Sequence, residues 1–144
     1  MKIKVISFGY KYQLMPKASI VFDLRFLDNP YWEPGMRTMS GLDKKVFDYV
    51  MSVPGAEEFY QDFKKTTDFI LPLAKKKEDK GGDIESIITI AFGCTGGQHR
   101  SVAFARRLGS DLKKSGYQVE IQHRDLEKSL QKEIERVKQE EREA

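Results

Sequence analysis

Two kinds of hydrophobic pattern succeed each other along this chain of 144 residues. Runs in which apolar residues alternate with polar ones, or follow one another directly, indicate strands, whereas apolar residues three or four positions apart indicate helices. Strands are expected over residues 2–8, 20–26, 84–92 and 117–122. Helices are expected over residues 43–51, 56–72 and 98–114 and from residue 125 onward. This order predicts a three-layer α/β fold, with a mostly parallel or mixed sheet of about four strands and helices on both faces.

Several details of these elements depend on single residues. Lysines alternate with apolar residues over 2–8, so this strand is expected at an edge of the sheet, and the more apolar strand 20–26 is expected to be more buried. Pro72 is expected to kink or end its helix, because proline has no backbone N–H to donate. A charged turn is expected over residues 75–82. Residues 28–41 contain two prolines and two glycines, which predicts a long functional loop.

Composition narrows the class of protein. The chain is 40% hydrophobic and 33% charged with a net charge of +3, which fits a one-domain globular protein and suits small phosphorylated ligands. The single cysteine excludes an internal disulfide. Neither a signal peptide nor an apolar run of roughly 18–20 residues is present, so a cytoplasmic protein without membrane contact is expected. No metal or cofactor is expected, because two histidines and one cysteine make a poor ligand cluster and no Walker motif is present.

The strongest chemical signal is the segment Gly-Cys-Thr-Gly-Gly-Gln-His-Arg-Ser at residues 93–101. It joins a predicted strand to a predicted helix, where free N–H groups and the helix dipole converge on one point and favour an anion. The glycines allow close approach of the backbone to a ligand. Arg100 adds a planar guanidinium that can bind phosphate with two hydrogen bonds. The predicted phosphate-binding residues of this loop are Cys94, Thr95, Gly96, Gly97, His99, Arg100 and Ser101.

The same loop permits an enzymatic interpretation. Cys94 and Arg100 have the Cys-x5-Arg spacing of cysteine-dependent phosphatases, in which a thiolate attacks phosphorus while the arginine holds the phosphate. A structural role for a lone buried cysteine is the alternative. The chain also lacks an Asp-Pro pair that could supply a general acid. Catalysis is therefore not the favoured interpretation.

Other candidates are dispersed along the chain. Asp23 and Arg25 share one face of a predicted strand, where they either form a buried ion pair or orient a polar ligand. Tyr31 and Trp32 either pack their loop or stack on a sugar or base. The segment 123–125 is a second-tier site candidate. Basic residues predicted to bind RNA around the same pole are Lys11, Lys64, Lys65, Lys113, Lys114 and Arg124.

Six blocks of sequence resemble, in the same order, the C-terminal domain of RapZ/YvcJ proteins. The blocks are SFGYKY at 7–12, VFDLRFL at 21–27, NPYW at 29–32, TMSGLD at 38–43, GCTGGQHRSV at 93–102 and HRDLEK at 123–128. The resemblance implies an α/β domain that senses glucosamine-6-phosphate and can bind small RNA as an adaptor for a ribonuclease. It places Asp23, Arg25 and the 94–100 loop at the ligand. Full-length members carry a nucleotide-binding domain first, so this chain is expected to be a stand-alone version.

The chain departs from the family in three places. Tyr31 stands where RapZ has a histidine, and Gln98 stands in place of a lysine. After Lys128 a mixed-charge helix replaces a basic tail, which divides the chain into a ligand-binding domain over 1–128 and a charged extension over 129–144. The narrow apolar stripe of this helix suits packing either on its own domain or on a neighbour, including a protein partner or a second copy.

The combined interpretation is a non-catalytic sensor of a phosphorylated small molecule, either an amino-sugar phosphate or a nucleotide sugar. An RNA-binding adaptor is the second interpretation. A cysteine-dependent phosphatase is the third.

Overall fold

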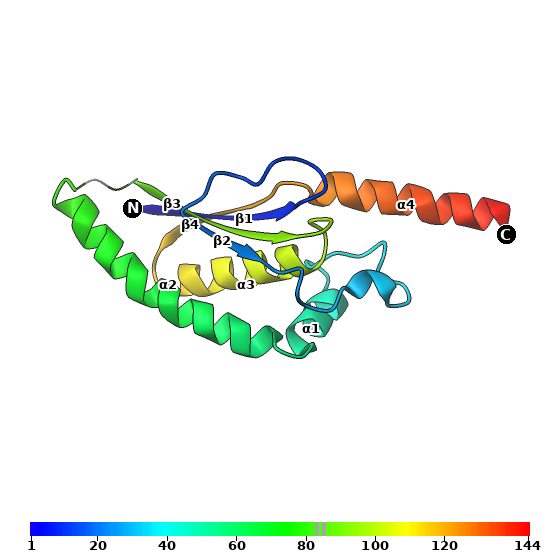
Figure 1. Cartoon of the computed structure of the whole chain (residues 1–144), viewed down its shortest axis with the longest axis horizontal. Coiled ribbons are helices and arrows are strands. Elements are labelled where there is room, and N and C mark those ends of the chain that lie inside the picture. Colours follow the sequence, from blue (N-terminus) through cyan, green and yellow to red (C-terminus); the bar gives the residue numbers. More distant parts are fainter. Residues whose placement is uncertain (83, 85) are drawn as a thin grey trace.

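The computed structural model describes residues 1–82, 84 and 86–144. In this part of the chain one sheet contains β1 (Lys2–Gly9), β2 (Ile20–Asp23), β3 (Ile87–Cys94) and β4 (Gln118–His123). All pairings are parallel and the strand order is β2-β3-β1-β4. The helices are α1 (Lys44–Ser52), α2 (Ala56–Asp79), α3 (Arg100–Lys114) and α4 (Leu126–Glu143), with a 3-10 turn η1 at Pro30–Trp32 (Figure 1). This confirms the predicted three-layer α/β fold with a parallel sheet.

The two faces of the sheet are covered differently. Helix α3 packs across β1, β3 and β4, and α1 and α2 lie on the same side (Figure 1). The other face holds a smaller cluster around Ile6, Phe8 and Ala91, against which Tyr10 and Ala18 of the connection from β1 to β2 pack. This connection is therefore the third layer. It runs from the carboxyl end of β1 back to the amino end of β2, and α1, α2 and α3 lie on the opposite face.

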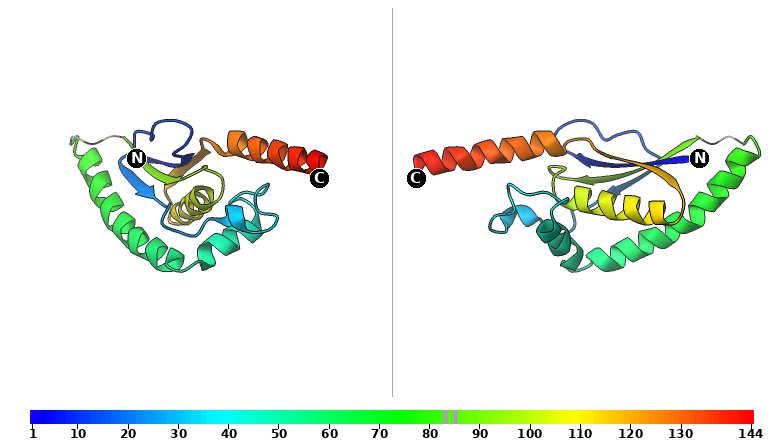
Figure 2. Two further views of the ribbon diagram at one scale, coloured as in Figure 1. Left: turned by 45° about the vertical axis from the view of Figure 1, so that its right-hand side comes forward. Right: turned by 180° about the vertical axis from the view of Figure 1, so that it is seen from behind.

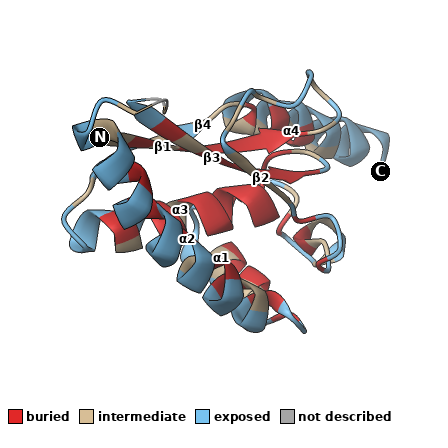
Figure 3. Ribbon diagram, turned by 60° about the vertical axis from the view of Figure 1, so that its left-hand side comes forward, coloured by how far each residue is buried: buried red, intermediate tan, exposed pale blue. Residues whose placement is uncertain are grey.

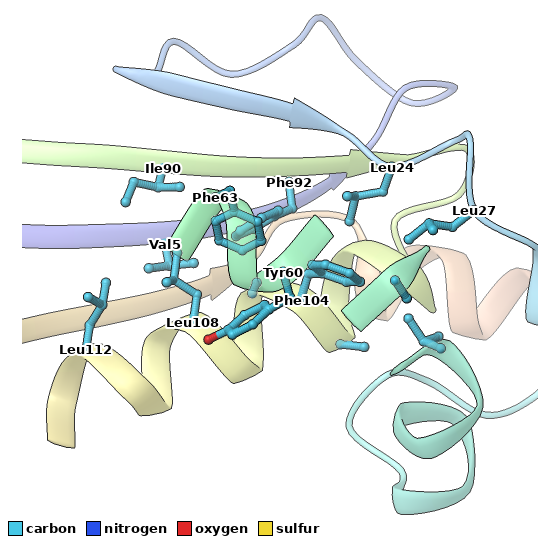
Figure 4. Close-up of a cluster of buried hydrophobic side chains, with 14 of the residues drawn as sticks. Val5, Leu24, Leu27, Tyr60, Phe63, Ile90, Phe92, Phe104, Leu108 and Leu112 are labelled. Carbon is cyan, nitrogen blue, oxygen red and sulfur yellow. The ribbon is translucent and has the colours of Figure 1, made fainter. Parts of the chain in front are cut away.

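The main core lies between the sheet and the three helices α1, α2 and α3. Buried residues concentrate on the strands and on α3, whereas α4 and the outer side of α2 are exposed (Figure 3). Aromatic rings from β3, α2 and α3 meet at the centre, with Phe92 and Phe104 at 6.0 Å and Phe63 and Phe92 at 5.3 Å between centroids (Figure 4). Burying such rings supplies much of the driving force for folding.

The positions of the first two strands are the reverse of the prediction. β1 is a central strand between β3 and β4, and β2 is an edge strand. Lys2 and Lys4 lie on the open face of the sheet, opposite the buried Ile3 and Val5. The alternation of lysines and apolar residues therefore indicates a strand with one covered face, not a strand at the edge of the sheet. β2 also stops at Asp23, since the chain turns at residues 25–26.

Helix α2 continues through Pro72, so the proline does not end it, and residues 75–79 are helical where a turn was predicted over 75–82. The helix ends at Asp79. Leu71 and Ala74 on either side of Pro72 are buried, whereas Pro72 itself is exposed. Burial on the inner face therefore outweighs the hydrogen bond that proline cannot make.

The remaining elements shift by a few residues. The strand predicted over 84–92 runs from Ile87 to Cys94, and Glu85 of that prediction lies outside the described residues. Gly9 pairs with Cys94 and Asp23 with Gly93, so β1, β2 and β3 end together at one edge of the sheet. Helix α3 starts at this edge and runs back for 15 residues, about 22 Å, to the opposite edge. None of the helices in the described ranges is long and apolar enough to cross a membrane.

Helix α4 leaves the carboxyl edge of the sheet and projects past the body of the domain (Figures 1 and 2). Its predicted apolar stripe consists of Leu126, Leu130, Ile134 and Val137, all of them only partly buried. Within the described residues, none of these side chains belongs to either hydrophobic cluster. The predicted division at residue 128 falls inside this helix.

Candidate functional site

The 94–99 loop is held against the end of β1 by direct contact between backbones. Tyr10 N donates to the carbonyl of Cys94 at 3.0 Å, and Lys11 N donates to that of Thr95 at 3.3 Å. Gly97 has φ +69°, and a Cβ at this position would lie 2.6 Å from Gly9 N. A side chain at residue 97 would therefore separate the loop from β1 and open the site.

The loop leaves a row of hydrogen-bond donors unused. Among the described residues, the backbone N–H groups from Thr95 to Val102 have no protein acceptor. The last of them belong to the first turn of α3, where the helix dipole adds partial positive charge. Thr95 is exposed and Gly96 is partly buried, whereas residues 97–102 are buried, and buried N–H groups without partners are rare in folded proteins. Such a row at the start of a helix favours an anion or water.

Arg100 lies at the first position of α3 and is only 4% exposed. Its Nη1 donates to the carbonyls of Leu27 at 2.8 Å and Arg25 at 3.3 Å, and its Nη2 donates to Thr95 Oγ1 at 3.4 Å. Its Nε is buried without a hydrogen-bond partner. The guanidinium is therefore fixed in place with donor capacity left over.

A cavity of about 210 Å³ opens over this loop. Three basic side chains, Lys11, Arg100 and Arg136, and one acidic side chain, Glu133, are part of its wall. The volume suits a small molecule more than a nucleic-acid strand. Residues lining the cavity are Lys11, Asn29, Tyr31, Trp32, Cys94, Thr95, Gly96, Gln98, His99, Arg100, Ser129, Glu133 and Arg136.

His99 and Gln98 connect the loop to the 28–41 segment. His99 Nε2 lies 2.7 Å from the carbonyl of Met36, to which it donates. Gln98 Nε2 donates to the carbonyls of Arg37 at 2.7 Å and Met39 at 2.8 Å. Burial holds the pKa of His99 below its ordinary value near 6.5, so the ring is neutral at pH 7. One nitrogen of His99 is thus occupied by the domain itself, although the residue borders the cavity.

Cys94 is 2% exposed, and its Sγ lies 3.1 Å from Ser101 Oγ. Ser101 is itself fully buried and is not part of the cavity wall. Reactive cysteines are usually accessible to solvent and held near cations, whereas buried ones serve structure. The Cys94–Ser101 contact joins the end of β3 to the first turn of α3.

The predicted site residues divide into two groups. Cys94, Thr95, Gly96, His99 and Arg100 border the cavity. Asp23, Arg25, Gly97 and Ser101 do not. The exposed carboxylate of Asp23 pairs with Arg25 at 2.7 Å, and its pKa is lowered mainly by that hydrogen bond. Arg25 also stacks on Tyr10 at 3.9 Å, so this pair is neither buried nor on the cavity wall.

The basic residues predicted to bind RNA do not share one pole. Lys11 borders the cavity at the carboxyl edge of the sheet, where Arg124 pairs with Asp125 at 3.0 Å. Lys113 and Lys114 lie at the far end of α3, at the amino edge of the sheet. This corrects the expectation of a single patch, because a helix that follows a parallel strand must return to the opposite edge.

Sequence reasoning missed the contribution of α4. Ser129, Glu133 and Arg136 border the cavity at spacings i, i+4 and i+7, so they share one face of the helix. Ser129 Oγ donates to Gln98 Oε1 at 2.8 Å. The apolar stripe of this helix lies directly beside these polar residues, and the predicted role of α4 rested on the stripe alone. The signal that was available is the polar face itself, directly after the 123–125 segment.

The fold and the cavity define an α/β domain that carries a small cation-rich pocket at the carboxyl edge of a parallel sheet, the usual place for ligands in such sheets. The family model described as RapZ C-terminal domain matches residues 1–127. The chain belongs to this family, and membership supports a regulatory or binding role in general. Helix α4 lies almost entirely beyond the matched residues.

Proposed function

We propose that this protein is a non-catalytic sensor that binds a phosphorylated small molecule in the cavity over the 94–100 loop. An amino-sugar phosphate or a nucleotide sugar is the ligand class. The observation that carries the proposal is the row of unused N–H groups from Thr95 to Val102, next to the fixed guanidinium of Arg100. Phosphate oxygens accept several hydrogen bonds at once and carry the charge that such a site stabilises.

Charge supports the same ligand. Lys11, Arg100 and Arg136 bring three positive charges to the cavity wall, against the one negative charge of Glu133. His99 adds none at pH 7, because burial lowers its pKa. The remaining excess of positive charge matches a phosphate dianion. Tyr31 and Trp32, of which Trp32 is 81% exposed, offer flat apolar surface for the organic part of the ligand.

Binding is favoured over phosphatase chemistry by the state of Cys94. Its Sγ is almost fully buried and is in hydrogen-bond contact with Ser101. A nucleophile must reach the phosphorus atom in line with the leaving group, which a thiol held against the helix does not favour. The cavity therefore offers better groups for holding a phosphate than for transferring it.

The test replaces Arg100 by alanine and compares Arg25→Ala, an exposed arginine in the adjacent turn. Binding of inorganic phosphate, glucosamine-6-phosphate and UDP-N-acetylglucosamine is measured by calorimetry and by thermal stabilisation. A ligand at a hundred times its Kd should stabilise the wild type by about 2.7 kcal/mol. Arg100→Ala should weaken binding by about 2–5 kcal/mol, since a desolvated phosphate loses its charged partner, and Arg25→Ala should leave it nearly unchanged.

Two results would contradict the proposal. One is equal affinity of wild type and Arg100→Ala for every phosphorylated ligand that binds. The other is release of phosphate from p-nitrophenyl phosphate that Cys94→Ser abolishes, which would establish the phosphatase instead.

A further inference from the structure

Helix α4 brings an acidic side chain into a cavity that is otherwise basic. Glu133 is 3% exposed and is part of the cavity wall. Oε1 accepts a hydrogen bond from Arg136 at 3.0 Å. Oε2 is buried without a hydrogen-bond partner, and it forms an ion pair with Arg37 Nη2 at 3.5 Å. A buried carboxylate oxygen without a donor is costly, so its presence requires an explanation.

Glu133 lies where it could contact the end of a ligand opposite the phosphate held by the 94–100 loop. Ser129, one helical turn before Glu133, hydrogen-bonds Gln98, and its Oγ would lie 3.4 Å from a Cβ on Gly96. One turn of helix is about 5.4 Å. The carboxylate therefore lies about one turn from the loop, the separation expected between a phosphate and a polar group elsewhere on one small molecule.

The helix is fixed in this position by polar contacts from the rest of the domain. Arg37 of the 28–41 segment binds Glu140 with two hydrogen bonds of 3.0 Å. Lys128 lies over the ring of Tyr12 at 4.6 Å. Within the described residues, the apolar stripe of α4 takes no part in the hydrophobic clusters. The face of α4 that is held against the domain is thus the polar one that borders the cavity.

We infer that Glu133 is a specificity-determining residue whose carboxylate accepts a hydrogen bond from the organic part of the phosphorylated ligand. The inference rests on the proposed function. It assigns to α4, which follows the family domain, the recognition of a hydroxyl or ammonium group on a ligand whose phosphate lies on the 94–100 loop. Glu133 and Arg100 are an acidic and a basic residue on the wall of the same cavity, as a ligand with two different polar ends requires.

The experiment measures how much more tightly an organic phosphate binds than inorganic phosphate. Kd values for inorganic phosphate, glucose-6-phosphate and glucosamine-6-phosphate are determined by calorimetry for wild type, Glu133→Ala and Glu140→Ala. Glu140 is the control, because it pairs with the same Arg37 from the same helix but is 58% exposed and lies off this cavity wall. Glu133→Gln, which keeps the shape of the side chain, serves if the alanine variant detaches α4.

Glu133→Ala should reduce the preference for sugar phosphate over inorganic phosphate about tenfold or more, since a hydrogen bond to a charged group is lost. Glu140→Ala should retain the preference. A larger loss for glucosamine-6-phosphate assigns the contact to the ammonium group, and an equal loss assigns it to a hydroxyl, each in support of the inference. An unchanged preference in both Glu133 variants would overturn it. Failure of the proposed function gives a different result from failure of this inference. In that case neither inorganic phosphate nor a sugar phosphate binds in a manner that depends on Arg100.

Discussion

At the scale of the residue, neighbouring glycines of the loop have different tasks. Gly97 has a left-handed backbone and touches Gly9, so the loop cannot close without it. Gly96 faces the cavity, where the nearest atom to an added Cβ is Ser129 Oγ at 3.4 Å. The sequence shows two equivalent glycines, whereas in the structure Gly97 contacts the backbone of β1 and Gly96 borders the cavity.

Gly97→Ala should lower the free energy of unfolding by about 1–3 kcal/mol, because alanine is strained at positive φ and its Cβ would overlap the backbone of Gly9. Gly96→Ala, the matched control, should cost less than about 1 kcal/mol. Urea denaturation followed by circular dichroism measures both variants. Equal stability of the two would disprove this division of tasks.

At the scale of the element, burial decides where helices end. Helix α2 continues for seven residues past Pro72 because its inner face is buried against the sheet and α3, with Leu71 only 1% exposed. Helix α4 is held in place by polar contacts instead of burial. Arg37 and Gln98 hydrogen-bond to it, and its apolar residues stay partly exposed. The two helices therefore depend on different forces.

Leu71→Ala should destabilise the domain by about 2–5 kcal/mol, as expected for a large core side chain replaced by a cavity. Leu73, two residues later on the same helix, is 53% exposed. Leu73→Ala should therefore change the stability by no more than about 0.5 kcal/mol. Thermal and chemical unfolding of the two variants compare them, and a large cost at Leu73 would show that the outer face of α2 is covered in solution.

At the scale of the whole molecule, both histidines join distant parts of the chain. His99 binds Met36 of the long loop, and His123 Nδ1 lies 2.6 Å from Ser7 Oγ of β1. Burial lowers the pKa of both rings below the ordinary value near 6.5. The unfolded chain therefore binds protons at a higher pH than the folded one, which links global stability to pH.

The ligand-free protein should lose stability as pH falls through about 6.5, because the unfolded histidines become protonated while the buried ones stay neutral. Above about pH 7.5 this contribution is complete and constant. Carboxyl groups such as Asp23, whose pKa is lowered by Arg25, affect a separate window near pH 4 and below. Tm measured from pH 8 to 5 should decrease below 7, and His99→Gln should flatten the curve. A flat wild-type curve would contradict this linkage.

The sequence alone determined the local features of this protein. In the described residues, hydrophobic periodicity located the strands and helices to within a few residues, except the end of α2, because most of these elements bury an apolar face. The strand–glycine–helix order of the 93–101 segment predicted the loop at the carboxyl edge. The six sequence blocks predicted the family to which the chain belongs. All of these depend on residues close together in the chain.

Tertiary structure decided what depends on distant residues. Strand order made β1 central, return of α3 to the far edge separated Lys113 from Lys11, and packing carried α2 through Pro72. The cavity wall was decided in the same way, since Glu133 borders the cavity only because α4 is held there by Gln98 and Arg37. Periodicity reports which face of an element is apolar, but it does not report which distant surface that element meets.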